Sequence, residues 1–67
     1  MAMRHLYLCI WREVQAGETI RRLQTRVPLA LDAAEARRLA LEMIPRLHPE
    51  VTGEIIIDRA QRIRGSN

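Results

Sequence analysis

The beginning of the chain alternates as an extended strand does, yet both sets of side chains are apolar. In LYLCIWREVQ, residues 6–15, one set is Leu6, Leu8 and Ile10, and the other is Tyr7, Cys9 and Trp11. Alternation with period two indicates a β-strand, which we expect over residues 4–15. A strand that is half-buried needs only one apolar face, so the second face requires an explanation.

Turn residues AGE follow this strand, and a second strand is predicted after them. TIRRLQTRV, residues 19–27, carries β-branched residues at both ends. We expect Pro28 to end this strand, because proline offers no hydrogen-bond donor to a sheet.

A helix start is the clearest local signal in the chain. Asp32 is suited to the N-cap and Glu35 to the third helical position, which together make a capping box. We expect the helix over residues 33–44, with Pro45 ending or kinking it at Ile44. Its apolar stripe has three- and four-residue spacing and consists of Ala36, Leu39, Ala40, Met43 and Leu47.

EIIIDRAQRI, residues 54–63, predicts a third strand, and RGSN, residues 64–67, a frayed tail. The expected fold is α+β with element order ββαβ, in one small domain of residues 1–67 that is ordered over about 4–63. The sheet is a three-stranded antiparallel-type sheet with the helix packed on one face. Its predicted spatial order is two-one-three, which makes the first strand central.

The hairpin register predicts which side chains share each face. With Ala16 and Gly17 as the loop, Ile10 lies opposite Leu23. Every aliphatic residue of both strands except Ile20 then faces the helix. On the other face we expect both aromatic residues and two arginines, joined by residues of the third strand: Tyr7, Cys9, Trp11, Arg22, Arg26, Ile56, Asp58, Ala60 and Arg62.

The chain is basic, with a formal net charge of +3 and a pI of about 10.4. All 11 of its basic residues are arginine, and most of the excess charge lies in the first half. Arginine binds phosphate bidentately and stacks on aromatic rings. An arginine-rich chain without lysine is also typical of a GC-rich coding sequence, so the position of the charge is more informative than its chemistry.

Candidate chemistry is sparse. Cys9 is the only cysteine, which excludes an internal disulfide and favours a cytoplasmic protein. His5 and His48 have no metal-ligand spacing with other residues. No activated nucleophile, carboxylate pair or phosphate-binding glycine loop is evident. We therefore expect no enzymatic activity, metal, cofactor, small-molecule substrate or membrane span.

The face turned away from the helix is the candidate binding surface, and three partners are considered besides solvent. A protein partner is favoured, because Trp, Tyr and Arg are enriched in binding hot spots. Its predicted contacts are Tyr7, Trp11, Arg22, Arg26, Ile56 and Arg62, with Arg37 and Leu41 as a secondary interface. The alternatives are RNA or single-stranded DNA, with bases stacked on the aromatics, and a structural homodimer.

Small basic domains of this kind suit inhibitors or adaptors of nucleic-acid-handling complexes, of the type that phages and mobile elements encode. This class is expected from the size and charge of the chain alone.

Overall fold

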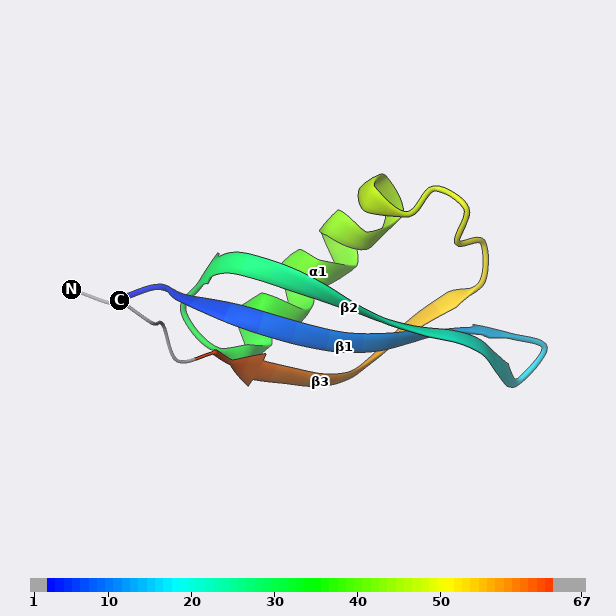
Figure 1. Ribbon diagram of the computed structural model, residues 1–67, viewed down its shortest axis with the longest axis horizontal. Helices are drawn as coiled ribbons and strands as arrows, with labels where there is room; N and C mark the ends of the chain where they lie inside the picture. The colour runs from blue at the N-terminus through cyan, green and yellow to red at the C-terminus, as the bar shows by residue number, and fades with distance from the viewer. Residues whose placement is uncertain (1–2, 64–67) are drawn as a thin grey trace.

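The three strands form one antiparallel sheet, and a helix lies across one of its faces (Figure 1). The computed structural model describes residues 3–63. The elements are β1 (His5–Gln15), β2 (Glu18–Ala30), α1 (Ala33–Leu47) and β3 (Glu54–Arg62). The sheet order is β2-β1-β3, with β1 antiparallel to both neighbours. The predicted fold class and strand order are confirmed, whereas the predicted frayed tail falls outside the described residues.

The β1–β2 hairpin has the predicted loop but a different register beyond it. Ala16 and Gly17 both have positive φ, 52° and 80°, as a two-residue hairpin turn requires. Gln15 pairs with Glu18 beside this turn, as expected. An irregularity then shifts the ladder, leaving Ile20 without a direct partner, so that Trp11 rather than Ile10 pairs with Leu23.

This bulge reverses the predicted facing of β1. Leu23 and Val27 lie on the helix side, as expected, but the residues that β1 pairs with them are Trp11 and Tyr7. Tyr7, Cys9 and Trp11 therefore lie under the helix, and Leu6, Leu8 and Ile10 lie on the opposite face. The prediction was wrong because a one-residue slip exchanges the two faces of a strand.

β2 and α1 both continue through a proline that was expected to end or bend them. Pro28 lies inside β2, which is an outer strand of the sheet and tolerates a missing donor. Pro45 lies inside α1, which continues to Leu47. Pro45 has no backbone N–H and cannot donate the helical hydrogen bond to the Leu41 carbonyl. Leu41 lies on the exposed side of the helix.

The capping of α1 follows the sequence signal closely. The Asp32 carboxylate accepts a hydrogen bond from the Glu35 backbone N–H at 2.8 Å. The Glu35 carboxylate accepts one in return from the Leu31 backbone N–H at 2.7 Å, one residue earlier than the standard capping box. At the other end, the His48 N–H donates to the Ile44 carbonyl. Both helix ends are thus capped by groups close in sequence.

The core between sheet and helix combines large aromatic residues with small helical ones. Trp11 and Tyr7 project from β1 toward α1, where the buried helix positions include Ala36 and Ala40. Alanines allow a helix to approach a sheet closely and leave room for an indole ring. Ile44 completes the buried helix face, whereas Leu47, predicted for the stripe, is 57% exposed.

Cys9 lies in this core, which leads to a testable prediction. Its thiol lies 3.7 Å from the Ala36 carbonyl oxygen. Burial raises the pKa of the Cys9 thiol, and Arg37 offsets part of the rise. The unfolded chain therefore ionises first as pH rises, so this contribution to stability is complete below about pH 8.5 and declines above it.

We expect native Cys9 to react with an aromatic disulfide reagent at least about 100-fold more slowly than in urea, since reaction requires opening. We also expect the unfolding free energy of the wild type to fall more steeply above pH 8.5 than that of Cys9→Ala. Rapid labelling of the native chain would contradict this burial.

Candidate functional site

The sheet face turned away from α1 is aliphatic along the central strand. We call it the open face. Its side chains come from all three strands: Leu6, Leu8, Ile10, Arg12 and Val14 from β1, Thr19, Arg22, Gln24 and Arg26 from β2, and Glu54, Ile56, Asp58, Arg59 and Gln61 from β3. The aliphatic members are half-buried among their neighbours. No other segment of residues 3–63 crosses this face, as Figure 1 allows the reader to follow.

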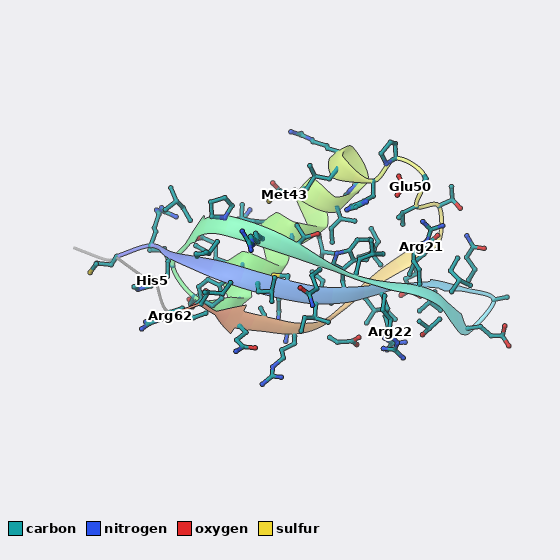
Figure 2. The ribbon with its side chains drawn as sticks, in the orientation of Figure 1. His5, Arg21, Arg22, Met43, Glu50 and Arg62 are labelled. Carbon is teal, nitrogen blue, oxygen red and sulfur yellow. The ribbon has the colours of Figure 1, made fainter. Side chains whose placement is uncertain are left out.

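One half of the open face is balanced in charge. The Arg12 Nε donates to both carboxylate oxygens of Asp58, at 3.0 and 3.1 Å. Arg12 also donates to the Thr19 hydroxyl, and an Arg22 nitrogen lies 3.9 Å from Asp58. Figure 2 shows Arg22 on the side of the sheet away from the helix. These contacts use Asp58, and Glu54 at the same end of the sheet supplies a second carboxylate, so this half offers little free charge.

The other half pairs aliphatic side chains with two free cations. Arg26 lies beside Leu8 on β2, and Arg59 lies beside Ile10 on β3. Directly paired residues share a face, so both arginines flank the aliphatic row of β1. Both are exposed, and no carboxylate among residues 3–63 lies within ion-pair distance of either. This half combines apolar surface with uncompensated positive charge.

The predicted site residues divide between the two faces. Arg22, Arg26 and Ile56 lie on the open face as expected. Tyr7 and Trp11 do not, because they are 7% and 0% exposed beneath α1.

Arg62 also lies on the wrong side for the predicted site. A second bulge, at Asp58, shifts the β1–β3 ladder so that Arg62 pairs with Tyr7 on the helix side. Ala60 moves to the helix side with it and packs against the core.

Sequence reasoning missed the aliphatic row and Arg59 as parts of this surface. The available signal was Ile20, the one aliphatic residue that the predicted register could not place on the helix side. A residue that breaks the alternation of an otherwise regular strand is a sign of a bulge. Placing one there would have put Leu6, Leu8 and Ile10 on the open face.

The predicted secondary site, Arg37 and Leu41, lies on α1. Arg37 extends from the helix to β3, where its guanidinium donates to the Ile57 carbonyl at 3.0 Å. Leu41 is 47% exposed. Arg37 thus has a structural contact of its own, and its role in an interface stays a prediction.

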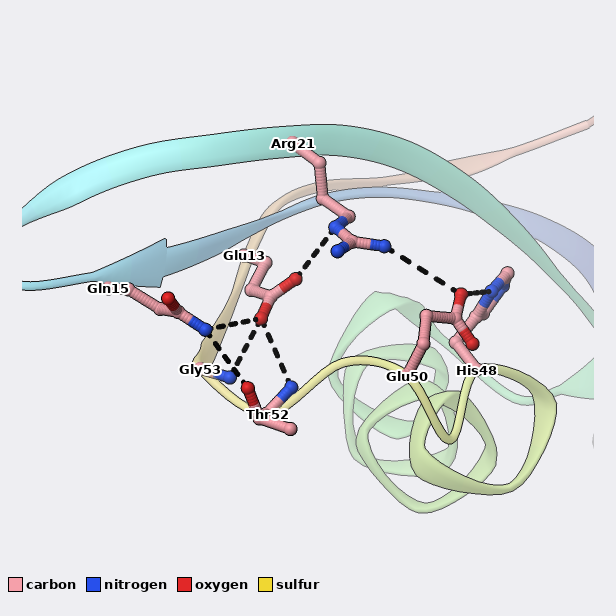
Figure 3. A network of polar contacts seen from close by, with 7 residues as sticks. All are labelled: Glu13, Gln15, Arg21, His48, Glu50, Thr52 and Gly53. Atoms are coloured by element: carbon pink, nitrogen blue, oxygen red, sulfur yellow. Dashed lines mark hydrogen bonds and ion pairs between the residues drawn. The ribbon is translucent and has the colours of Figure 1, made fainter.

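A polar cluster on the helix side fixes the α1–β3 loop against β1 (Figure 3). The Glu13 carboxylate is fully buried and accepts hydrogen bonds from the backbone N–H groups of Thr52 and Gly53 at 3.1 and 2.8 Å. Its Oε1 lies 2.8 Å from the Arg21 Nε, in an ion pair without hydrogen-bond alignment. The cluster therefore positions a loop, and it lies away from the open face.

Close approach of the loop also depends on Gly53. A Cβ at this position would lie 2.5 Å from the Val14 carbonyl oxygen, too close for any other residue without a backbone shift. At the edge of the cluster, the pKa of the Glu50 carboxyl is lowered by a backbone hydrogen bond and by the contact of this carboxyl with His48. His48 in turn stacks at a tilt on Trp11, with ring centroids 5.5 Å apart. The loop is thus tied to both the sheet and the core.

Comparison with protein-family models, curated proteins and solved structures found no match. Within residues 3–63, no helix has the length and apolar character needed to cross a membrane. The same residues contain no cluster of three or more His, Cys, Asp or Glu side chains that could hold a metal ion. The functional argument therefore depends on the open face itself.

Proposed function

We propose that this chain is a non-enzymatic binding protein that uses its open face to bind a partner protein. The observation that carries the proposal is the row of Leu6, Leu8 and Ile10 on the central strand, with arginines on both sides. An apolar centre with a polar, arginine-containing rim is the usual composition of a protein interface. A role as an adaptor or inhibitor in the cytoplasm fits this surface and the free thiol of Cys9.

Aliphatic side chains favour a protein over a nucleic acid as the partner. Fully burying one Leu or Ile side chain contributes about 1.5–3 kcal/mol, so covering this row supplies useful binding energy. Single-stranded nucleic acids instead need aromatic side chains on which bases stack. The two aromatic residues of this chain, Tyr7 and Trp11, lie beneath the helix, so the open face offers aliphatic and arginine side chains but neither aromatic ring.

The proposal is tested by comparing two matched single substitutions. Leu8→Asp places a charge in the centre of the open face, and Leu47→Asp places the same charge at the exposed end of α1. Both should fold, because neither side chain belongs to the core cluster. Each is used as bait in cross-linking capture from the source cells, and captured partners are then purified and rebound.

We expect a purified partner to bind the wild type and Leu47→Asp equally, and to lose at least tenfold in affinity for Leu8→Asp. Hydrogen exchange in the complex should slow along β1. Equal binding of the partner to all three chains would overturn the proposal. Binding of labelled single-stranded DNA that depends on Leu8 would favour the nucleic-acid alternative instead.

A further inference from the structure

We infer that the segment bound by the open face is an amphipathic helix with acidic side chains on both flanks of its apolar stripe. This inference rests on the proposed function and specifies the chemistry of the partner. It depends on three features of the face: its width, the position of its aliphatic row and the position of its free charges.

The width of the open face suits one helix. Strands lie about 4.8 Å apart, so the flanking strands β2 and β3 are roughly 10 Å apart, close to the diameter of a helix. The opposite face of the same three strands is covered by one helix, α1, whose apolar stripe lies along the core (Figure 1). A helix on the open face would complete a layered arrangement with the sheet in the middle.

The aliphatic row defines the length of contact. Leu6, Leu8 and Ile10 span five residues of an extended strand, and the four steps between the first and the last cover roughly 13 Å. A helix rises about 5.4 Å per turn, so two to three turns match this row. A partner helix therefore needs apolar residues at three- and four-residue spacing over about this length.

The free cations define the flanks. Arg26 and Arg59 lie on the two outer strands, on opposite sides of the row, and neither has an ion-pair partner among residues 3–63. A helix lying along β1 would place one flank over each arginine. Carboxylates on both flanks meet these guanidinium groups, whereas lysines there would be repelled.

The same charges disfavour a second copy of this chain as the occupant. Two open faces packed together would bring the arginines of one copy against those of the other. The helix of a second copy does not fit either, because its apolar stripe is already buried and its outer side carries Arg38 beside Glu42. Like charges around an apolar patch thus select against self-association.

Two synthetic peptides test the inference with the purified chain. Both are helices of about 18 residues, stapled on the outer side because short helices are marginal in water. Leucines spaced three and four form one stripe. One peptide carries glutamates on both flanks of the stripe, and the other carries lysines at the same positions. Affinities are measured by fluorescence anisotropy at low and physiological salt.

We expect the wild type to bind the glutamate peptide at least tenfold more tightly than the lysine peptide. Arg26→Glu/Arg59→Glu should reverse this preference, and Leu8→Asp should lose both peptides. Arg46→Glu/Arg62→Glu is the matched control, because it changes net charge equally away from the open face and should keep the wild-type preference.

Each other outcome is decisive. Equal binding of the two peptides that is lost in Leu8→Asp would overturn the acidic-helix inference and leave the proposed function standing. Peptide binding that survives in Leu8→Asp would contradict both. Failure to bind either peptide overturns the inference. A wild-type dimer by light scattering that becomes monomeric in Leu8→Asp would do so as well, since a second copy would then occupy the face.

Discussion

Replacing Trp11 with alanine is expected to unfold a large fraction of this protein at room temperature. Trp11 is the largest fully buried side chain and lies between Leu23 and Ile57 in the sheet. Its indole N–H donates to the Thr25 hydroxyl at 2.9 Å, and this buried hydroxyl would lose its partner. Removing a buried aromatic side chain costs about 3–5 kcal/mol. A domain of this size has a total stability of roughly 3–10 kcal/mol, so little would remain.

Far-ultraviolet circular dichroism during urea unfolding is the suitable measurement, because Trp11 is the only tryptophan and its fluorescence disappears with the substitution. The matched control is Leu8→Ala, three residues earlier on the opposite face of the same strand. We expect that variant to lose less than about 1.5 kcal/mol, because its side chain is only half-buried. If Leu8→Ala unfolds the protein and Trp11→Ala does not, Trp11 does not face the core and the facing of β1 is the reverse.

Features of the fold that depend on local sequence could be predicted. The Ala16–Gly17 turn and the Asp32 cap are specified by residues next to each other in the chain. The strand order follows from a hairpin joined by a helix to a third strand, which leaves few arrangements. Each of these predictions is confirmed by the structure.

The facing of β1 could not be obtained in the same way, because it depends on an irregularity between two strands. Leu23 and Val27 were correctly expected on the helix side, but either face of β1 can accompany them, depending on one unpaired residue at Ile20. The aliphatic face of β1 looked like the natural core. The aromatic face is buried instead, because α1 presents alanines opposite it.

The facing of β1 also determines which side chains belong to the candidate site. Arg22, Arg26 and Ile56 were placed correctly, whereas Tyr7 and Trp11 moved into the core and the aliphatic row took their place. The finding that no segment of residues 3–63 covers one sheet face does not depend on the register, since one helix covers one face. The chemistry of that face does depend on the register. With the observed register, it indicates apolar contacts flanked by charge.

Loss of the Glu13 carboxylate is the second substitution with a large expected effect. In Glu13→Ala, the backbone N–H groups of Thr52 and Gly53 lose their acceptor. An unsatisfied buried donor costs about 1–3 kcal/mol, or about 2–6 kcal/mol for two donors, and the partial exposure of Thr52 and Gly53 places the expected loss in the lower half of that range. Arg21 is part-exposed and water can solvate its guanidinium, which is why the loss of that ion pair adds little.

Two variants separate the hydrogen bonds from the charge. Glu13→Gln keeps a carbonyl oxygen for both N–H groups but places an amide near Arg21, so we expect a loss of only about 1 kcal/mol. Arg21→Ala leaves the buried Glu13 Oε1 without its cation but keeps both loop hydrogen bonds, so we expect a loss of about 1–3 kcal/mol. Hydrogen exchange at Thr52 and Gly53 reports the mechanism directly, since both amides should exchange faster in Glu13→Ala before the rest of the protein opens. If Arg21→Ala destabilises as much as Glu13→Ala, the ion pair and not the loop hydrogen bonds holds α1 and β3 together at this end of the sheet.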